Sequence, residues 1–133
     1  MKKLILLLSV LLFSLEFVAA QDEYERSVFV SSSGDSLNYR LLEPEVMQAG
    51  EKYPLVLFLH GAGERGNDNE KQLTHGGQMF LNPVNREKYP AFVLFPQCPE
   101  SGYWAYENRP QSFIPTQMPV GKEMPSVFQA VKE

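Results

Sequence analysis

Two short runs of the sequence are apolar at every position, and they restrict the fold more than any other feature. They are Leu55–Leu59 and Ala91–Phe95. A strand without a polar side has to be covered on both faces, as in the centre of a parallel sheet with helices on both sides. Between the two runs, Asn69–Asn82 contains a predicted short helix, interrupted by Gly76 and Gly77. This order of strand, helix and strand predicts an α/β fold with right-handed crossovers.

An antiparallel hairpin is predicted upstream of the apolar runs. Ser27–Ser31 contains residues that favour an extended backbone, and Leu37–Leu42 alternates between apolar and polar positions over most of its length. The turn sequence Ser32–Asp35 joins the two segments and contains a glycine. The polar connector Glu43–Tyr53 then leads into the first apolar run. We therefore expect a mixed, mostly parallel sheet that starts with a hairpin.

The last part of the sequence predicts a long loop followed by a helix. Residues 96–125 are rich in proline, glutamine and aromatic residues and predict an extended loop. A helix is predicted to begin near Pro125, because proline is well tolerated in the first turn. Val127, Phe128 and Val131 would form its apolar face. The sequence ends roughly two turns later without a glycine cap, which predicts that a longer protein continues beyond Glu133.

The N-terminal segment, residues 1–20, is predicted to be a cleavable signal peptide. Lys2 and Lys3 precede the apolar stretch Leu4–Leu15, and small residues follow at the expected cleavage site. A membrane anchor is the alternative, but crossing a bilayer takes about 20 apolar residues, and Glu16 interrupts this segment. We expect a secreted or periplasmic protein whose mature domain, residues 21–133, has no stable membrane insertion.

The composition gives no indication of nucleic-acid, metal or cofactor binding. The formal net charge is −4, and Lys and Arg are not clustered. The histidines His60 and His75 lack a cysteine or carboxylate at ligand spacing, so no metal site is predicted. A single cysteine, Cys98, excludes an internal disulfide. No cofactor is predicted either, and the fold must depend on its hydrophobic core.

A loop of small residues, His-Gly-Ala-Gly-Glu-Arg-Gly over residues 60–66, directly follows the first apolar run. Open α/β sheets bind their ligands at the carboxyl ends of such strands. Gly61, Ala62 and Gly63 leave the backbone unshielded, so its N–H groups can approach a reacting atom closely. In acyl transfer, negative charge develops on the former carbonyl oxygen, and aimed N–H donors stabilise it. The loop therefore predicts an oxyanion-binding role.

With its preceding strand, Tyr53–Gly66 resembles the third strand and oxyanion loop of the α/β-hydrolase superfamily. More narrowly, it is similar to the secreted esterase, dienelactone-hydrolase-like and prolyl-oligopeptidase-like branch. Phe92–Pro99, followed by Trp104, is similar to the fourth strand and next loop of that branch. The resemblance extends over about Val28 to Glu133 and implies the N-terminal part of a hydrolase domain.

The resemblance implies a serine nucleophile in a G-x-S-x-G turn, followed by an acidic residue and a histidine. The sequence contains no G-x-S-x-G, so the truncated domain ends before the nucleophile. What the resemblance carries over is the oxyanion loop, with the Ala62 N–H as the expected donor and Gly61 and Gly63 shaping the turn. We expect these residues to be the catalytic contribution of the chain.

The function predicted from the resemblance is hydrolysis of a carboxylic ester or peptide bond in a small-molecule substrate. The chain alone is expected to be inactive, because the nucleophile is missing. The alternative is a short exported protein that binds without catalysis, or a pseudoenzyme. In that case Leu55–Leu59 would lie at an exposed sheet edge, through which copies could dimerise or aggregate.

Several residues near the loop have both a structural and a functional interpretation. His60 is expected to support the loop by hydrogen bonding rather than to act as the catalytic base. Glu64 and Arg65 are expected to pair with each other or to fix the loop by hydrogen bonds, with substrate contact as the alternative. Cys98 is expected to be a small buried residue. Trp104 either lines a substrate-binding pocket, together with neighbouring tyrosines, or only covers the sheet.

Overall fold

The computed structural model describes residues 23–105 and 123–131. The predicted signal peptide, most of the long loop and the side chain of Phe128 lie outside this part of the chain. Among the described residues, none of the helices has the length and hydropathy needed to cross a membrane.

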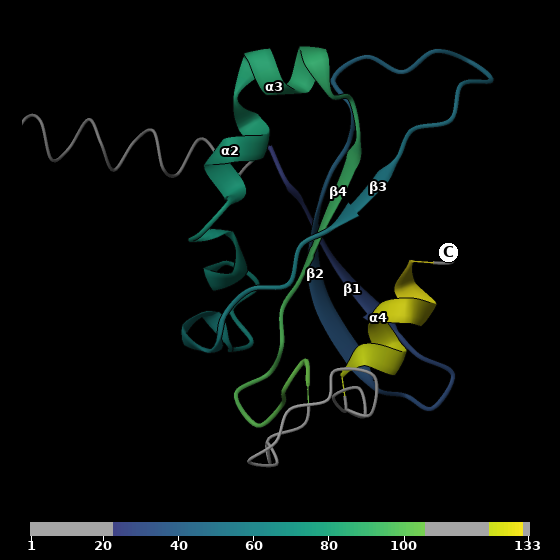
Figure 1. Cartoon of the computed structure of the whole chain (residues 1–133). Coiled ribbons are helices and arrows are strands. Elements are labelled where there is room, and N and C mark those ends of the chain that lie inside the picture. Colours follow the sequence, from purple (N-terminus) through teal and green to yellow (C-terminus); the bar gives the residue numbers. More distant parts are fainter. Residues whose placement is uncertain (1–22, 106–122, 132–133) are drawn as a thin grey trace, which may run out of the picture.

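The described residues form a four-stranded mixed sheet in the order β1-β2-β4-β3 (Figure 1). Its strands are β1 (Glu25–Val30), β2 (Ser36–Leu42), β3 (Leu55–Leu57) and β4 (Phe92–Pro96). β2 runs antiparallel to both β1 and β4, whereas β3 runs parallel to β4. The α/β class, the starting hairpin and the two later strands are therefore confirmed. This part of the sheet is mostly antiparallel, because it contains the hairpin.

The hairpin turn has the predicted position. Gly34 has a φ of +88°, a left-handed conformation that side chains disfavour. The Gly34 N–H donates to Ser31 O at 2.9 Å, and the Ser31 N–H donates to Asp35 O at 2.8 Å. The strand register follows from this turn, with Phe29 opposite Leu37.

Short helices follow the strands. They are the 3-10 helices η1 (Ala62–Glu64) and η2 (Lys71–Leu73) and the α-helices α2 (Gly77–Leu81), α3 (Pro83–Lys88) and α4 (Met124–Ala130). The predicted interruption at Gly76 is confirmed, since its φ of +93° separates η2 from α2. α3 was not predicted, although the Asn82 side chain caps it and Pro83 occupies its first turn.

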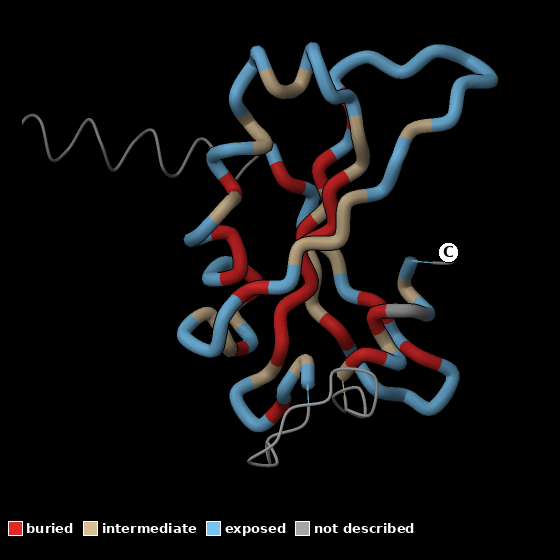
Figure 2. The backbone as a smooth tube through the Cα atoms, viewed as in Figure 1, coloured by how far each residue is buried: buried red, intermediate tan, exposed pale blue. Residues whose placement is uncertain are grey.

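Helices cover both faces of the sheet. On one face, η2 and α2 pack against Leu42, Val93 and Phe95, with the Tyr24 side chain in the same cluster. On the other face, α4 places Val127 against Phe29 and Leu37. Figure 2 shows that burial is greatest along the central strands. β4 is buried over residues 93–96, as predicted for a central strand.

Two predicted elements differ from the structure. β3 is shorter than Leu55–Leu59, and it lies at the edge of the described sheet, where Leu55 is 42% and Leu59 38% exposed. With a neighbour on one side only among the described residues, β3 is exposed along its free edge. Val131 is also exposed, because it follows the end of α4, so Val127 carries the contact with the sheet.

Candidate functional site

The loop that follows β3 and the segment that follows β4 both leave the sheet at the carboxyl ends of the strands, on the same side, because the two strands are parallel neighbours (Figure 1). The first is residues 60–66 and the second is residues 97–104. The Gly66 N–H donates to Cys98 O at 3.0 Å and joins the two segments. The sequence-predicted residues Gly61, Ala62, Gly63 and Trp104 therefore lie near one another at the carboxyl ends of the strands, where open α/β sheets bind ligands.

His60 lies beneath the loop, only 5% exposed. The Cys98 N–H donates to His60 Nε2 at 2.9 Å, so Nε2 carries no proton. The proton is therefore on Nδ1, which donates to Gly61 O at 2.6 Å. With both ring nitrogens engaged, His60 supports the loop as expected from the sequence and has no free nitrogen to act as a base.

Successive carbonyl groups of the loop each accept a hydrogen bond from a side chain. Trp104 Nε1 donates to His60 O at 3.0 Å. His60 Nδ1 donates to Gly61 O, and Arg65 Nε donates to Ala62 O at 3.0 Å. Arg65 therefore fixes the loop, as predicted. The indole of Trp104 also packs edge-on against the imidazole of His60, at 5.3 Å between ring centroids.

These carbonyl contacts determine where the N–H groups of the loop point. In a trans peptide the C=O and the following N–H point in opposite directions. Since the carbonyls of residues 60–62 face the side chains of Trp104, His60 and Arg65, the N–H groups of residues 61–63 face away from them. Within the described part of the chain, no hydrogen bond uses these N–H groups. Ala62 and Gly63 are exposed, and a methyl group added at Gly63 would meet no atom within 4 Å.

The loop therefore presents backbone donors toward open space. Backbone N–H groups that are held without side-chain obstruction can donate to an anion. They are already oriented, so little reorganisation is needed when a charge develops beside them. The sequence predicted the residues of this loop and the supporting roles of His60 and Arg65, but not the backbone groups that their side chains bond to.

A buried polar network anchors the far end of the loop. Gln97 Oε1 accepts from the Asn69 N–H at 2.7 Å, and Gln97 Nε2 donates to Asp68 Oδ1 at 2.8 Å. From the hairpin, Arg40 Nε donates to Asn69 O at 2.7 Å. Asn69 has a φ of +54°, an uncommon conformation for a residue with a side chain. Asparagine adopts this conformation more readily than most residues, and the network holds Asn69 in it from both sides.

The Asp68 carboxylate is stabilised in its charged form. Burial by itself would raise the pKa of Asp68. Hydrogen bonds from the Lys71 N–H, the Gln97 amide and the Glu70 N–H together outweigh this effect and hold the pKa well below its ordinary value. Asp68 is therefore a permanent acceptor at neutral pH and orders the turn that follows the loop.

Cys98 is not an activated nucleophile. It is 1% exposed, and burial, reinforced by the nearby Glu123 carboxylate, raises the pKa of its thiol to about 11. A reactive cysteine needs a lowered pKa and access to solvent. The predicted role as a small buried residue agrees with this environment.

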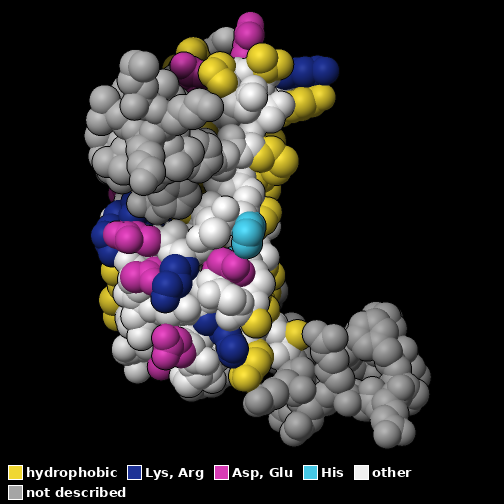
Figure 3. Space-filling model, turned by 90° about the vertical axis from the view of Figure 1, so that its left-hand side faces the viewer, with side chains coloured by type: hydrophobic (Ala, Val, Ile, Leu, Met, Phe, Trp, Pro, Cys, Tyr) yellow, Lys and Arg dark blue, Asp and Glu magenta, His cyan; other side chains and the backbone are white. Residues whose placement is uncertain are grey.

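Charged side chains near the loop show no cluster of one sign. His75 is exposed, and its Nε2 lies 3.4 Å from Glu64 Oε1. On the face shown in Figure 3, acidic and basic side chains are intermixed, and hydrophobic side chains gather along one margin. Among the residues that the structure describes, no group of His, Cys, Asp and Glu side chains is arranged to hold a metal ion.

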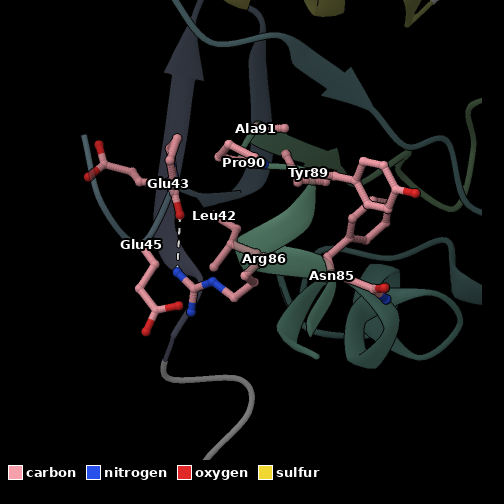
Figure 4. A pocket seen from close by; sticks show the side chains of 11 residues that line it. Leu42, Glu43, Glu45, Asn85, Arg86, Tyr89, Pro90 and Ala91 are labelled. Atoms are coloured by element: carbon pink, nitrogen blue, oxygen red, sulfur yellow. Dashed lines mark hydrogen bonds between the residues drawn. The ribbon is translucent and has the colours of Figure 1, made fainter. Parts of the chain in front are cut away.

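A small pocket occurs at the opposite end of β4. Its lining comes from the end of β2, from α3 and from residues 89–91, with Arg86 at its centre (Figure 4). Arg86 donates to Glu43 O at 3.1 Å and to Glu23 Oε2 at 2.7 Å. The bond to Glu43 O links the connector to α3. The pocket shares no residue with the loop, and we assign the site to the loop.

A solved structure described as that of a thermostable esterase matches this chain with a TM-score of 0.74 and 33% sequence identity. The match covers 86% of this chain and 30% of the esterase chain. This chain is similar to an esterase. The likeness is consistent with part of an α/β-hydrolase-like fold, and this chain spans about 30% of the length of the esterase that it matches. No protein-family profile and no curated protein matches the sequence.

Proposed function

We propose that the chain supplies the oxyanion-stabilising loop of a serine-type ester hydrolase. The observation that carries this proposal is the orientation of the loop, in which side chains hold the carbonyls of Gly61 and Ala62 so that the N–H groups of Ala62 and Gly63 face open space. The likeness to a structure described as an esterase favours an ester over a peptide as the bond that is cleaved.

In the proposed reaction, a nucleophile attacks the carbonyl carbon of the ester. The carbonyl oxygen becomes an oxyanion and accepts hydrogen bonds from the Ala62 and Gly63 N–H groups. Losing one such donor costs roughly 3 to 4 kcal/mol of transition-state stabilisation. The His60 ring does not take the proton of the nucleophile, because its nitrogens already bond to Gly61 and Cys98.

The nucleophile, its base and the acidic partner are proposed to come from outside this sequence, which contains no G-x-S-x-G. We propose a secreted or periplasmic location on the basis of the N-terminal segment, and a small-molecule ester as substrate. A binding role without catalysis is the alternative, and the exposed edge at β3 is where copies would associate in that case.

The donor role of Ala62 is tested by Ala62→Pro, which removes only this N–H. Proline fits here because Ala62 begins η1 and the preceding Gly61 is extended, with φ −77° and ψ 178°. We expect the free energy of unfolding to stay within about 0.5 kcal/mol of the wild type. Phenylphosphonate, a tetrahedral anion, should bind about tenfold or more weakly, because a hydrogen bond to a charged group is lost.

Binding is followed by the amide chemical shifts of Gly61 and Gly63 during a phenylphosphonate titration of the 133-residue chain. Ala62→Gly is the matched control, since it keeps the N–H. The amide of Gly34, in the distant hairpin turn, should not respond in any variant. Equal phenylphosphonate affinities for Ala62→Pro and Ala62→Gly would remove the basis of the proposal.

The purified chain is expected to show no turnover of p-nitrophenyl acetate above the buffer rate. Neither the Cys98 thiol nor His60 is available as an attacking group or base. The measurement is the initial rate of p-nitrophenolate release over a range of protein concentrations. A rate that increases with protein concentration and disappears in Ala62→Pro would show that the chain contains its own nucleophile.

A further inference from the structure

We infer that Arg65 is a positioning residue that sets the direction of the Gly63 N–H and so helps to fix the donor face of the loop, the surface formed by the N–H groups of residues 61–63. The inference rests on the proposed function, because it assigns a role within the same site. Arg65 lies on the carbonyl side of the loop and acts through the peptide group between Ala62 and Gly63.

The central contact is the bond from Arg65 Nε to Ala62 O, at 3.0 Å. Ala62 O and the Gly63 N–H belong to the same trans peptide, so holding the oxygen on one side turns the N–H to the other. Gly63 itself offers no resistance to rotation, because it has no side chain and no atom lies within 4 Å of where a Cβ would be. Among the described residues, and apart from the single turn of η1, the contact that holds this peptide is therefore the one from Arg65 Nε to Ala62 O.

Arg65 is in turn fixed by the segment that follows β4. Its Nη1 donates to Gly102 O at 3.3 Å, and its Cζ lies 4.7 Å from the centre of the Tyr103 ring. Gly102 is buried, and a Cβ there would lie 2.7 Å from the Glu123 side chain, so this backbone is closely packed. The planar guanidinium can bond to both carbonyls and stack on the ring, which a lysine ammonium cannot do in the same way.

His60 and Arg65 therefore hold different peptide groups of the loop. His60 holds Gly61 O and so orients the Ala62 N–H, whereas Arg65 holds Ala62 O and orients the Gly63 N–H. Both side chains also form hydrogen bonds with the segment that follows β4. His60 accepts from the Cys98 N–H, and Arg65 donates to Gly102 O. The positions of the N–H groups of residues 61–63 thus depend on the segment after β4 as well as on β3.

The test compares Arg65→Ala and Arg65→Lys with the wild-type 133-residue chain. In Arg65→Ala, the carbonyl ¹³C signal of Ala62 and the amide ¹⁵N signal of Gly63 should move, because Ala62 O loses its donor. Phenylphosphonate affinity should fall about tenfold, as for the loss of one donor. Methylguanidinium at low, non-denaturing concentration should restore both signals and most of the affinity in Arg65→Ala, whereas ammonium at equal ionic strength should not.

Arg65→Lys separates geometry from charge, since it keeps the positive charge without the guanidinium fork. We expect it to show the same loss as Arg65→Ala. An unchanged amide shift at Gly34 serves as the check that each variant is folded. If Arg65→Lys retained wild-type affinity, or if Arg65→Ala left the Ala62 carbonyl signal in place, the positioning role would be overturned.

The outcomes also distinguish this inference from the proposed function. Failure of the wild-type loop amides to respond to phenylphosphonate, with the Ala62 carbonyl signal still sensitive to Arg65, would overturn the oxyanion role and support the positioning role. Equal phenylphosphonate responses in wild type and Arg65→Ala would support the oxyanion role and overturn the positioning role.

Discussion

Gln97→Glu is expected to destabilise the protein by about 3 to 5 kcal/mol at neutral pH. This is the range found when one partner of a buried ion pair is removed and the other charge is left uncompensated. Gln97 is 2% exposed, and its Nε2 lies 2.8 Å from Asp68 Oδ1 and 3.4 Å from Glu64 O. Glutamate would place a carboxylate oxygen against these two acceptors. The measurement is the free energy of unfolding in urea at pH 7.

The loss of unfolding free energy in Gln97→Glu should become smaller as the pH falls. In the wild type, the pKa of Asp68 is lower in the folded than in the unfolded state, so its stabilising contribution is complete above about pH 4 and is lost below that. In the variant, two adjacent carboxylates share a proton, which raises the pKa of the pair on folding. The variant should therefore gain stability relative to the wild type as the pH falls from 7 toward about 4.5.

The double variant Asp68→Asn, Gln97→Glu is the matched control. It removes the charge at position 68, while the asparagine Oδ1 can keep the bonds from the Glu70 and Lys71 N–H groups, so the repulsion between two like charges is absent. Its destabilisation should be smaller than the sum of the two single changes, with a coupling of about 1 to 3 kcal/mol. A loss in Gln97→Glu that is constant from pH 7 to 4.5, with additive single effects, would contradict the assigned contact.

Gly76→Ala is expected to cost about 2 to 4 kcal/mol, because two penalties act together. A φ of +93° is unfavourable for a residue with a Cβ. The new methyl group would also lie 2.7 Å from the nearest ring carbon of Phe58. That ring cannot move away easily, since it stacks on Phe95 at 4.7 Å and contacts Phe80 edge-on at 6.2 Å.

Gly34→Ala separates the two penalties. Gly34 has a similar φ of +88°, but a methyl group there would meet no atom within 4 Å. Only the conformational cost of about 1 kcal/mol remains. Urea unfolding of both variants gives the comparison. Equal losses at the two positions would mean that Phe58 does not pack over Gly76 as described.

Local patterns in the sequence predicted the strands, the hairpin turn and the break at Gly76, because each depends on neighbouring residues. α3 was missed although Asn82 and Pro83 form a recognisable helix start. The length of β3 was overestimated, since an apolar run does not reveal whether a strand has neighbours on both sides. The start of α3 could therefore have been recognised from Asn82 and Pro83, whereas the length of β3 could not be read from residue type alone.

For the site, the supporting role predicted for His60 is confirmed, whereas the donor role of the loop stays a prediction. The sequence could not identify the contact between Gln97 and Asp68 or that between Trp104 and His60, because the partners are far apart in the sequence and follow no periodic pattern. The interpretation of Trp104 was left open, and the structure shows a structural contact for its indole nitrogen. Its contribution to a substrate pocket stays a prediction.

The strand order has a consequence for the assembly of the chain during synthesis. β4 lies between β2 and β3, although it is made after both. The β1–β2 hairpin is local and can form early, whereas β3 has no described neighbour until residues 92–96 emerge, and closing such a long loop slows pairing. Gln97 and Cys98 emerge immediately after β4, so the segment made earlier, residues 60–69, acquires its shape last. The described sheet is therefore complete once β4 has formed, whereas residues 60–66 are fully held only after residues 97–104 have emerged, because Trp104 Nε1 bonds to His60 O and Arg65 Nη1 bonds to Gly102 O.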